Sequence, residues 1–393
     1  MQNVSRWTFL KDVLVCSLGA FGGPESHYGV FSQQLVEKRQ YLTQEELGEL
    51  IALTSLLPGP SSTQTLLAIG YKHGGKPLAW LTLLVWALPV VLVMTVLSFS
   101  PQLLASWDVT VDVFRTLPAL ALGFVVLALV NLSRKTFTDP WLLLFAGAAF
   151  VLTLFFRQFW LFPLMMLVGG GTYLWSSPKR QSWQKLSRPP AWRYFVLMVS
   201  LAVFAYGAAQ LTGHRLLVLF DAFYRYGLLV IGGGQVLIPY MYSGLVEQFG
   251  FLSSEAFMTG YGLVQGLPGP MFSFSAYAGG LASSELGLFG QTLGALLSVT
   301  AIFLPAVLLM FFIFPLWTEL QAMPNIKIIL KGVVAVAIGL IASTGVVMAQ
   351  NLTFGLDIWL VFILTVVVML SKKIPAPLWV LMVIVAGVVI PFG

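Results

Sequence analysis

Long apolar segments recur along the whole chain, and each is long enough to cross a bilayer, which takes roughly 17 to 25 residues as a helix. A chain that crosses the hydrocarbon core must satisfy its own backbone amides and carbonyls, and over segments of this length a helix does so. We therefore predict an all-α polytopic membrane protein with about 13 transmembrane helices. The apolar windows are 9–36, 48–72, 77–104, 113–133, 140–156, 158–176, 194–212, 216–246, 257–282, 288–317, 328–350, 356–371 and 375–392.

The composition excludes several other classes of protein. Of the residues, 58% are hydrophobic and 9% are charged, whereas a soluble domain carries about a quarter of charged residues. The net charge is +6, but no basic cluster interleaved with aromatic residues lies on a polar segment, so we expect no nucleic-acid partner. Cys16 is the single cysteine, which excludes an intrachain disulfide and a multi-cysteine metal site.

The distribution of basic residues predicts the orientation in the membrane. If the loops alternate across the 13 spans, 15 of the 21 Lys and Arg residues lie on the side of the N-terminus and 5 lie on the other side. The remaining one, Arg225, lies inside a predicted span. Cytoplasmic loops carry the excess of basic residues. We therefore expect a cytoplasmic N-terminus and an external C-terminus.

The sequence contains an internal repeat. Residues 21–25 (Phe-Gly-Gly-Pro-Glu) match residues 231–235 (Ile-Gly-Gly-Gly-Gln), and Leu-Pro-Gly-Pro occurs at 57–60 and again at 267–270, in both cases 210 residues later. With six extra residues, the stretch that begins at Arg115 then matches the one that begins at Lys331. Repeats in one register along two halves of a membrane chain are typical of transporters.

The repeat predicts an inverted topology. The first span corresponds to the eighth, so seven crossings separate the two copies, and an odd number of crossings turns one copy upside down. We predict a 6+1+6 arrangement, in which residues 1–193 hold spans 1–6 with the basic loop and residues 194–393 hold linker span 7 with spans 8–13. Secondary transporters of this kind bind substrate near the bilayer midplane.

Each Leu-Pro-Gly-Pro motif lies in the middle of an apolar window, where proline and glycine should break the helix. The second proline suits the first position of a new half-helix. The amides of Ser62, Thr63 and Gln64, and of Met271, Phe272 and Ser273, would then lack intrahelical partners and attract an anion.

We therefore predict an oxyanion site between the two half-helix ends. The alternative is that Gly and Pro only allow close packing and kinks, with Ser and Thr bonded to their own helical turn. The substrate-binding candidates are Gly22, Gly23, Pro24, Pro58, Gly59, Pro60, Ser61, Ser62, Thr63, Gln64, Gly233, Gly234, Gln235, Pro268, Gly269, Pro270, Ser273 and Ser275.

Four ionisable residues inside predicted spans are functional candidates, since charge in the membrane is costly. Glu25 and His27 follow the first break, and either could carry a coupling proton, although a polar helix end explains them equally well. Asp221 and Arg225 are four residues apart and can pair on one helix face; Arg225 could also attract an anion. His73 and His214 fall in predicted loops.

No enzyme signature is present in the sequence. We find no phosphate loop with its lysine, no His-Glu-x-x-His and no pair of intramembrane aspartates. We therefore expect a transporter that is not an enzyme and that needs no cofactor and no metal. The alternative from another class is a membrane-embedded enzyme or lipid-modifying protein, which would require a nucleophile or a metal.

These motifs resemble those of the chromate ion transporter family in its long form with two homologous halves, over nearly the whole chain. The first half carries residues 21–24 with His27, and 57–60 followed by Gln64; the second carries 232–234 and 265–270 (Gln-Gly-Leu-Pro-Gly-Pro). The resemblance implies a proton-coupled transporter that exports chromate across the bacterial inner membrane and confers chromate resistance. Its partners would be the oxyanion, protons and the lipid bilayer, and a homodimer is compatible with it.

Two positions depart from the family pattern. Ser61 stands where some members have Glu, and Gln235 stands where many have His, so two ionisable groups are missing. Proton coupling would then rest on Glu25 and His27, or be absent, and a sulfate or general oxyanion carrier is the alternative. Export is favoured because moving a dianion out of a cell about 100 mV negative inside gains roughly 4.6 kcal/mol.

The predicted orientation can be tested with reporter fusions. Because 13 spans place the two termini on opposite sides, alkaline phosphatase fused after Gly393 should be active and green fluorescent protein at the same position should be dark. Alkaline phosphatase fused after Lys135, in a predicted cytoplasmic loop, is the control and should be inactive. A fluorescent, phosphatase-negative C-terminus would mean an even number of spans.

Overall fold

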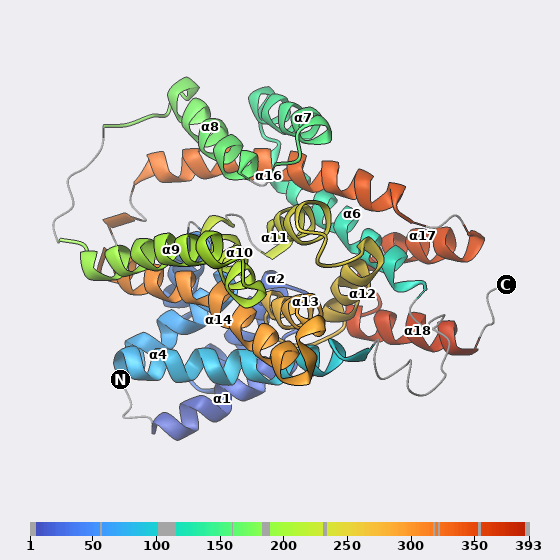
Figure 1. Cartoon of the computed structure of the whole chain (residues 1–393). Helices are drawn as coiled ribbons and strands as arrows, with labels where there is room; N and C mark the ends of the chain where they lie inside the picture. Colours follow the sequence, from blue (N-terminus) through green and yellow to red (C-terminus); the bar gives the residue numbers. More distant parts are fainter. Residues whose placement is uncertain are drawn as a thin grey trace. The chain divides into compact units, whose positions relative to one another are not determined.

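The computed structural model describes residues 5–55, 57–100, 115–158, 160–182, 189–230, 234–316, 319–320, 323–352 and 355–389. Its regular elements are helices, and these residues contain no strand (Figure 1). Five helical stretches are long and apolar enough to span a membrane: α4 (Ser61–Leu97), α6 (Leu117–Thr136), α9 (Trp192–Thr212), Ser284–Leu316, which contains α14 (Gly287–Ile313), and α16 (Pro324–Gln350).

Four shorter helices are also apolar, namely α7 (Pro140–Phe155), α8 (Leu161–Ser176), α17 (Leu356–Ser371) and α18 (Ala376–Val389). Large apolar side chains such as Phe155, Leu167 and Phe204 are exposed on these helices and on α9. Apolar surface of this extent suits lipid and not water. The prediction of an all-α multi-pass membrane protein is confirmed, whereas the number of 13 spans, their inversion and the orientation stay predictions.

The helices form two compact units. Unit 1 comprises Met1–Thr95, Gln181–Gly234 and Pro268–Ile326, and unit 2 comprises Val96–Arg180, Gln235–Leu267 and Lys327–Gly393. Each unit therefore contains segments from both halves of the sequence. The division into repeat halves at residue 193 concerns the sequence repeat and stays a prediction.

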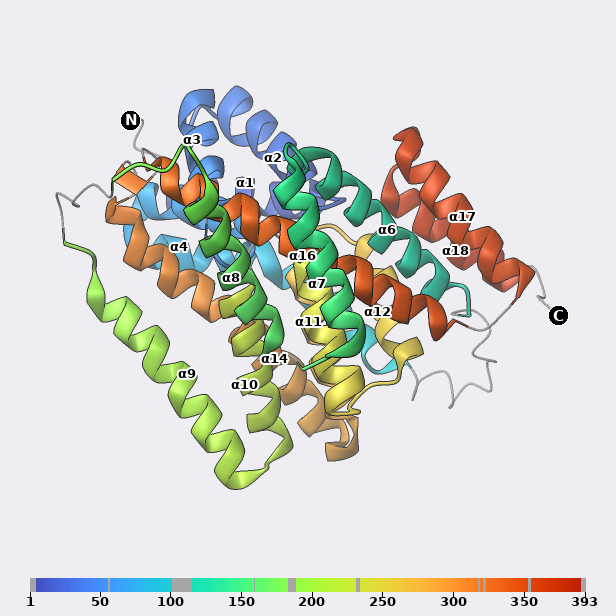
Figure 2. The ribbon, with the colours of Figure 1, turned by 90° about the horizontal axis from the view of Figure 1, so that it is seen from above.

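Unit 1 is organised around α14, which packs against three helices: α9, α10 (Arg215–Leu229) and α13 (Phe274–Ala282) (Figures 1 and 2). Small residues permit this close packing. A Cβ added at Gly227 of α10 would lie 2.1 Å from the carbonyl oxygen of Ile302, and one added at Gly279 of α13 would lie 2.0 Å from Ser298 Oγ.

The first segment of the chain completes unit 1. It contains α1 (Arg6–Gly19), α2 (Pro24–Phe31), the π-helix η1 (Ser32–Lys38) and α3 (Gln44–Thr54), followed by α4. The predicted breaks are confirmed, because α3 ends at Thr54 before the first Leu-Pro-Gly-Pro and α4 begins at Ser61 after it.

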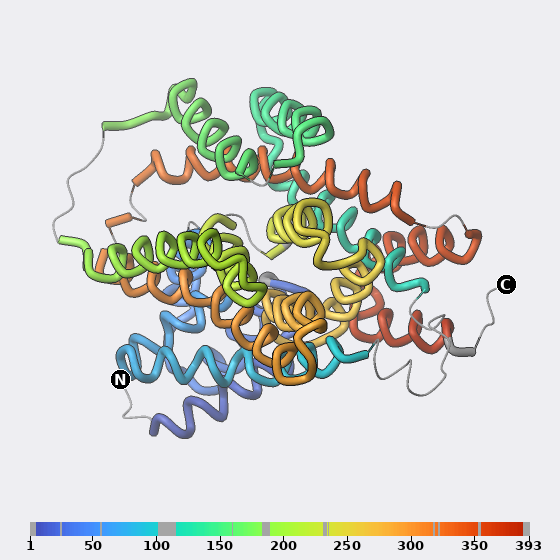
Figure 3. The backbone as a smooth tube through the Cα atoms, in the orientation of Figure 1, coloured from blue at the N-terminus to red at the C-terminus, as the bar shows by residue number. Residues whose placement is uncertain are grey.

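Unit 2 contains the remaining helices. Besides α6–α8 and α16–α18 these are α11 (Gly234–Tyr242), whose first residue belongs to unit 1, the π-helix η3 (Ser243–Gln248) and α12 (Ser254–Gln265). α6 packs against α12 and α17. Figure 3 shows α16 as one continuous coil over its 27 residues. Glu247 of η3 forms an ion pair with Arg157.

Local structure recurs at the positions that the sequence repeat pairs. The π-helices η1 and η3 each follow the helix that comes after a glycine-rich segment. Thr43 and Ser253 are the N-caps of α3 and α12, and the side chain of each accepts a hydrogen bond of 3.1 Å from the amide three residues later. Both side chains therefore cap a helix start, and Glu46 completes the capping box of α3.

The two broken segments bond to each other crosswise within unit 1. The amide of Gly59 donates to the carbonyl of Val230 (2.7 Å), and the amide of Gly269 donates to the carbonyl of Ala20 (2.8 Å). Gly59 pairs with Gly269, and Ala20 with Val230, at the same spacing of 210 residues. Each Leu-Pro-Gly-Pro loop therefore satisfies the helix end that belongs to the other sequence half.

Neither glycine in this exchange can be replaced without cost. Gly59 has φ +107° and Gly269 has φ +109°, values that L side chains rarely adopt. A Cβ at Gly59 would lie 2.9 Å from Ala306 Cβ, and one at Gly269 would lie 2.9 Å from Val90 Cγ1.

We expect Gly59→Ala and Gly269→Ala each to destabilise the protein by about 1–3 kcal/mol, the cost of a strained backbone conformation. The measurement is the thermal unfolding midpoint of the purified protein in detergent. Gly207→Ala is the control, because Gly207 lies in α9 and a Cβ there would meet no atom within 4 Å. An unchanged midpoint in both variants would contradict the importance of the exchange.

Candidate functional site

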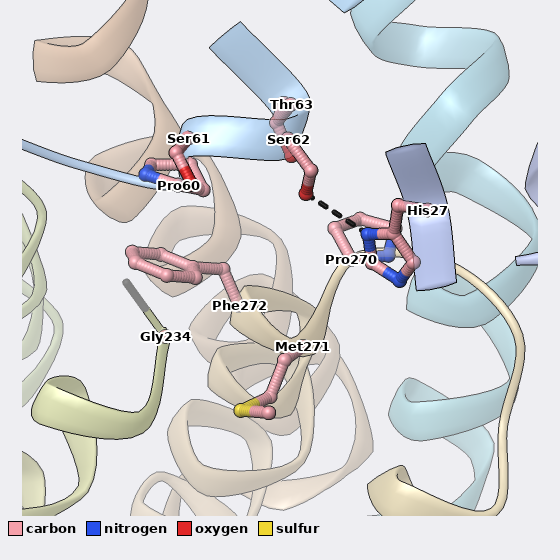
Figure 4. Close-up of a pocket in the computed structure, with 9 residues that line it drawn as sticks. All are labelled: His27, Pro60, Ser61, Ser62, Thr63, Gly234, Pro270, Met271 and Phe272. Atoms are coloured by element: carbon pink, nitrogen blue, oxygen red, sulfur yellow. Dashed lines mark hydrogen bonds between the residues drawn. The ribbon is translucent and has the colours of Figure 1, made fainter. Parts of the chain in front are cut away.

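A pocket in unit 1 brings together both Leu-Pro-Gly-Pro loops. Its lining consists of His27, Pro60, Ser61, Ser62 and Thr63 from the first half and Gly234, Pro270, Met271 and Phe272 from the second (Figure 4). Seven of these nine residues are candidates from the sequence analysis. The other two, Met271 and Phe272, were expected to contribute only their backbone amides. The predicted convergence of the two broken segments on one place is therefore present in the structure.

The first-half wall of the pocket is the N-terminus of α4. Pro60 precedes the helix and its carbonyl accepts the amide of Gln64 at 2.9 Å. Within the described residues, the amides without an intrahelical partner are therefore those of Ser61, Ser62 and Thr63, one position earlier than we predicted, because Pro60 caps the helix instead of starting it. Gln64 does not line the pocket; its Nε2 donates to the carbonyl of Pro58 (2.7 Å) and holds the loop.

The second-half wall is chemically different. Residues Met271–Ser273 form the 3₁₀ turn η4, and the amide of Ser273 donates to the carbonyl of Pro270 (2.9 Å). The prediction of a free Ser273 amide is therefore wrong, because the tighter turn uses that donor. Ser273 and Ser275 are fully buried outside the pocket lining, so the side chains that face the pocket here are those of Pro270, Met271 and Phe272.

Aromatic side chains support the hydroxyls of the first-half wall. Tyr28 donates its OH to Ser61 Oγ (3.0 Å), and Trp86 Nε1 donates to Thr63 Oγ1 (3.1 Å). Figure 4 shows the third contact, a hydrogen bond of 2.9 Å between His27 Nδ1 and Ser62 Oγ.

Trp86 and Tyr28 are supporting residues that sequence analysis missed, and Trp86 makes more contacts around the pocket. It is fully buried, its carbonyl accepts a hydrogen bond from Ser17 (2.7 Å), and its ring packs edge-on against His27 and Phe31. Tryptophan in membrane proteins usually lies at the interface. Its place in the middle of the window 77–104 is the signal that would have found it.

His27 is the coupling candidate that the structure places in the pocket. Its side chain is 2% exposed, and its Nε2 has no hydrogen-bond partner among the described residues. The side chain of Glu25, the other candidate, lies outside the described residues. The same holds for the side chains of Pro24 and Gln235 and for all of Gly233.

The remaining described candidates do not line the pocket. Gly22 and Gly23 form the loop before α2 with φ +83° and +92°. Pro58, Gly59, Pro268 and Gly269 belong to the crosswise-bonded loops. Asp221 and Arg225 form a two-point ion pair on α10, with distances of 3.1 and 2.6 Å, which confirms the predicted pairing.

A second buried polar cluster is centred on Asp12, in the middle of α1. Asp12 accepts hydrogen bonds from Gln34 (2.8 Å), Arg39 (2.9 Å) and Tyr41 (2.5 Å) and so ties α1 to η1 and the turn after it. His73, expected in a solvated loop, packs against Tyr41 with ring centroids 5.6 Å apart, so that expectation is wrong.

Nearby, a hydrogen bond from Lys72 lowers the pKa of Glu46 at the start of α3. The described residues contain no group of three or more His, Cys, Asp or Glu placed to hold a metal ion.

Comparison with known proteins identifies relatives over the whole chain. The family profile described as chromate transporter matches residues 7–175 and 217–390, one match in each half. A probable chromate transport protein of Synechococcus elongatus is 28% identical over 376 residues, which cover 95% of this chain and 93% of that protein. A chromate transport protein of Cupriavidus metallidurans is 26% identical over 369 residues, covering 93% and 87%. No solved structure gives a significant match.

The role of Trp86 can be tested by Trp86→Phe, which keeps the ring and removes the donor to Thr63. Losing one neutral hydrogen bond should weaken binding of a tetrahedral oxyanion roughly 5- to 10-fold, as measured by equilibrium binding to the purified protein. Trp141→Phe, on the exposed face of α7, is the control. Equal affinity of the Trp86 variant and the wild type would show that the hydrogen bond from Trp86 to Thr63 does not contribute to anion binding.

Proposed function

The chain belongs to the chromate transporter family, and we propose that it is a secondary transporter that exports chromate across the bacterial inner membrane and confers chromate resistance. One observation carries this proposal: the pocket between the two Leu-Pro-Gly-Pro loops has a wall made of the N-terminal amides of α4 and of hydroxyls that accept hydrogen bonds from Tyr28 and Trp86. The relatives named as chromate transport proteins support the choice of oxyanion.

The first-half wall suits an oxyanion for two reasons. The amides of Ser61, Ser62 and Thr63 stand at the positive end of the α4 dipole, where anions are stabilised. The three hydroxyls supply further donors, and burial strengthens these hydrogen bonds because water does not compete for them. The side chains of Met271 and Phe272 close the other side and offer no hydrogen bond to a competing water.

Transport proceeds in this proposal by alternating access of an inverted repeat with 13 spans. The crosswise bonds Gly59–Val230 and Gly269–Ala20 support it, since a pseudo-two-fold axis produces such reciprocal contacts. The two π-helices support it as well, because they occur at paired positions and such helices are frequent at functional sites.

Export is the direction that the membrane potential favours, by about 2.3 kcal/mol for each negative charge moved outward across 100 mV. Proton coupling would act through His27, which lines the pocket, together with Glu25 two residues earlier. Protons entering as the oxyanion leaves would add the pH gradient to this driving force.

The test is uptake of labelled chromate into everted membrane vesicles, in which export appears as uptake. We expect saturable uptake that falls when the membrane potential is collapsed, and a further fall on collapsing the pH gradient if protons are coupled. Ser61→Ala should raise the KM roughly 5- to 10-fold through loss of one hydrogen bond, whereas Ser200→Ala, on the exposed side of α9, should not.

Two results would contradict the proposal. Absence of uptake above that of vesicles without the protein would remove chromate as the substrate. A rise in KM with Ser273→Ala as large as that with Ser61→Ala would restore the two-sided site that the sequence motifs predict.

A further inference from the structure

The three hydroxyls of the pocket share one arrangement. Ser61 Oγ accepts from the phenol of Tyr28, and Thr63 Oγ1 accepts from the indole of Trp86. A hydroxyl that accepts from one side keeps its own hydrogen for a second partner. Tyr28 and Trp86 thus leave the hydrogens of Ser61 and Thr63 available to a bound anion.

Ser62, between these two residues, fits the same arrangement with His27 as its donor. The contact between His27 Nδ1 and Ser62 Oγ is 2.9 Å, and either atom can carry the hydrogen. If Nδ1 donates, all three hydroxyls keep their hydrogens for the anion. A neutral imidazole that donates through Nδ1 presents a lone pair at Nε2.

The neutral state of His27 follows from its surroundings. The pocket lining contains no other titratable side chain. The two residues of α4 that contact the imidazole ring of His27, Ser62 and Trp86, are uncharged. Tyr28 on α2 is engaged with Ser61, and the side chain of Glu25 lies outside the described residues. Among the described residues, a buried imidazolium would lack the partner that buried charges require.

We propose, on the basis of the function proposed above, that this pocket selects an oxyanion that carries a proton, here hydrogenchromate, by accepting the hydrogen bond of its OH group at His27 Nε2. The amides and hydroxyls of residues 61–63 bind the unprotonated oxygens. Nε2 is buried and has no partner among the described residues, so the OH group of the anion supplies the donor that it lacks.

This arrangement discriminates between anions of the same shape. Chromate takes up a proton near neutral pH, whereas sulfate does so only in strong acid. A sulfate oxygen placed against the Nε2 lone pair would leave two acceptors facing each other and a buried acceptor unsatisfied. We therefore expect sulfate to bind roughly 10- to 100-fold more weakly than chromate.

The test is equilibrium binding to the purified full-length protein at neutral pH with four probes. Arsenate carries an OH group at this pH and chromate is partly protonated, whereas sulfate and selenate are unprotonated. The wild type should prefer chromate over sulfate, and arsenate over selenate, by roughly 10- to 100-fold in each case.

His27→Gln should bring both affinity ratios, chromate over sulfate and arsenate over selenate, closer to 1, because a rotatable amide can offer its NH₂ to an unprotonated oxygen. A purely structural role of His27 would instead weaken all four anions equally. His214→Gln is the control, since His214 is an exposed residue at the start of α10. The wild-type preferences test the proposal even if the His27 variant does not fold.

The outcomes separate this inference from the proposed function. Equal binding of chromate and sulfate by the wild type would overturn the inference and leave chromate transport intact. Preference for arsenate over selenate without chromate binding would remove chromate as substrate and support the acceptor at His27. Sulfate binding that strengthens at lower pH in the wild type, but not in His27→Gln, would indicate that a charged His27 donates to the anion, and this would overturn the inference.

Discussion

The structure of unit 1 depends on how its broken helices satisfy their backbone. Where Leu-Pro-Gly-Pro interrupts a helix in apolar surroundings, amides and carbonyls lose their partners, and in a membrane each unsatisfied group costs several kcal/mol. The exchange of Gly59 with Val230 and of Gly269 with Ala20 satisfies one amide and one carbonyl at each of the two breaks. It also brings the start of α4 and the turn η4 to the same pocket.

The two halves contribute equivalent backbone to the pocket but different chemistry. The first half offers Ser61, Ser62 and Thr63 at a helix N-terminus, and the second offers Met271 and Phe272 on a 3₁₀ turn whose third amide is already bonded. The polar wall can bind an anion, and the apolar wall opposite it excludes water. The two equivalent backbone segments of the repeat thus take different roles in one pocket.

Trp86 accounts for part of this difference. Its indole supports Thr63 and its ring packs against His27, so a residue with no pocket contact of its own orients two residues that have one. Leu88-Pro89 matches Leu304-Pro305, 216 residues later, and this register pairs Trp86 with Ile302, whose side chain has no donor. Ser273, the counterpart of Thr63, is buried without a hydroxyl partner among the described residues.

The features that depend on interactions between residues close in the chain could be predicted from the sequence by itself. The apolar windows determined a helical membrane protein, proline and glycine determined where the helices break, and Thr43 and Ser253 marked helix starts, because each of these effects acts within a few residues. The ion pair of Asp221 and Arg225, four residues apart, belongs to the same class. The motifs also located His27 and residues 60–63 in the pocket.

Only the tertiary structure decided which groups meet across longer distances. The bonds of Trp86 to Thr63 and of His27 to Ser62 join residues 23 and 35 positions apart, and the crosswise glycine bonds join different halves of the chain. The helix register at Pro60 and the 3₁₀ turn at Met271–Ser273 also depend on the loops they face. Packing selects among local conformations of similar energy, and a motif does not record that choice.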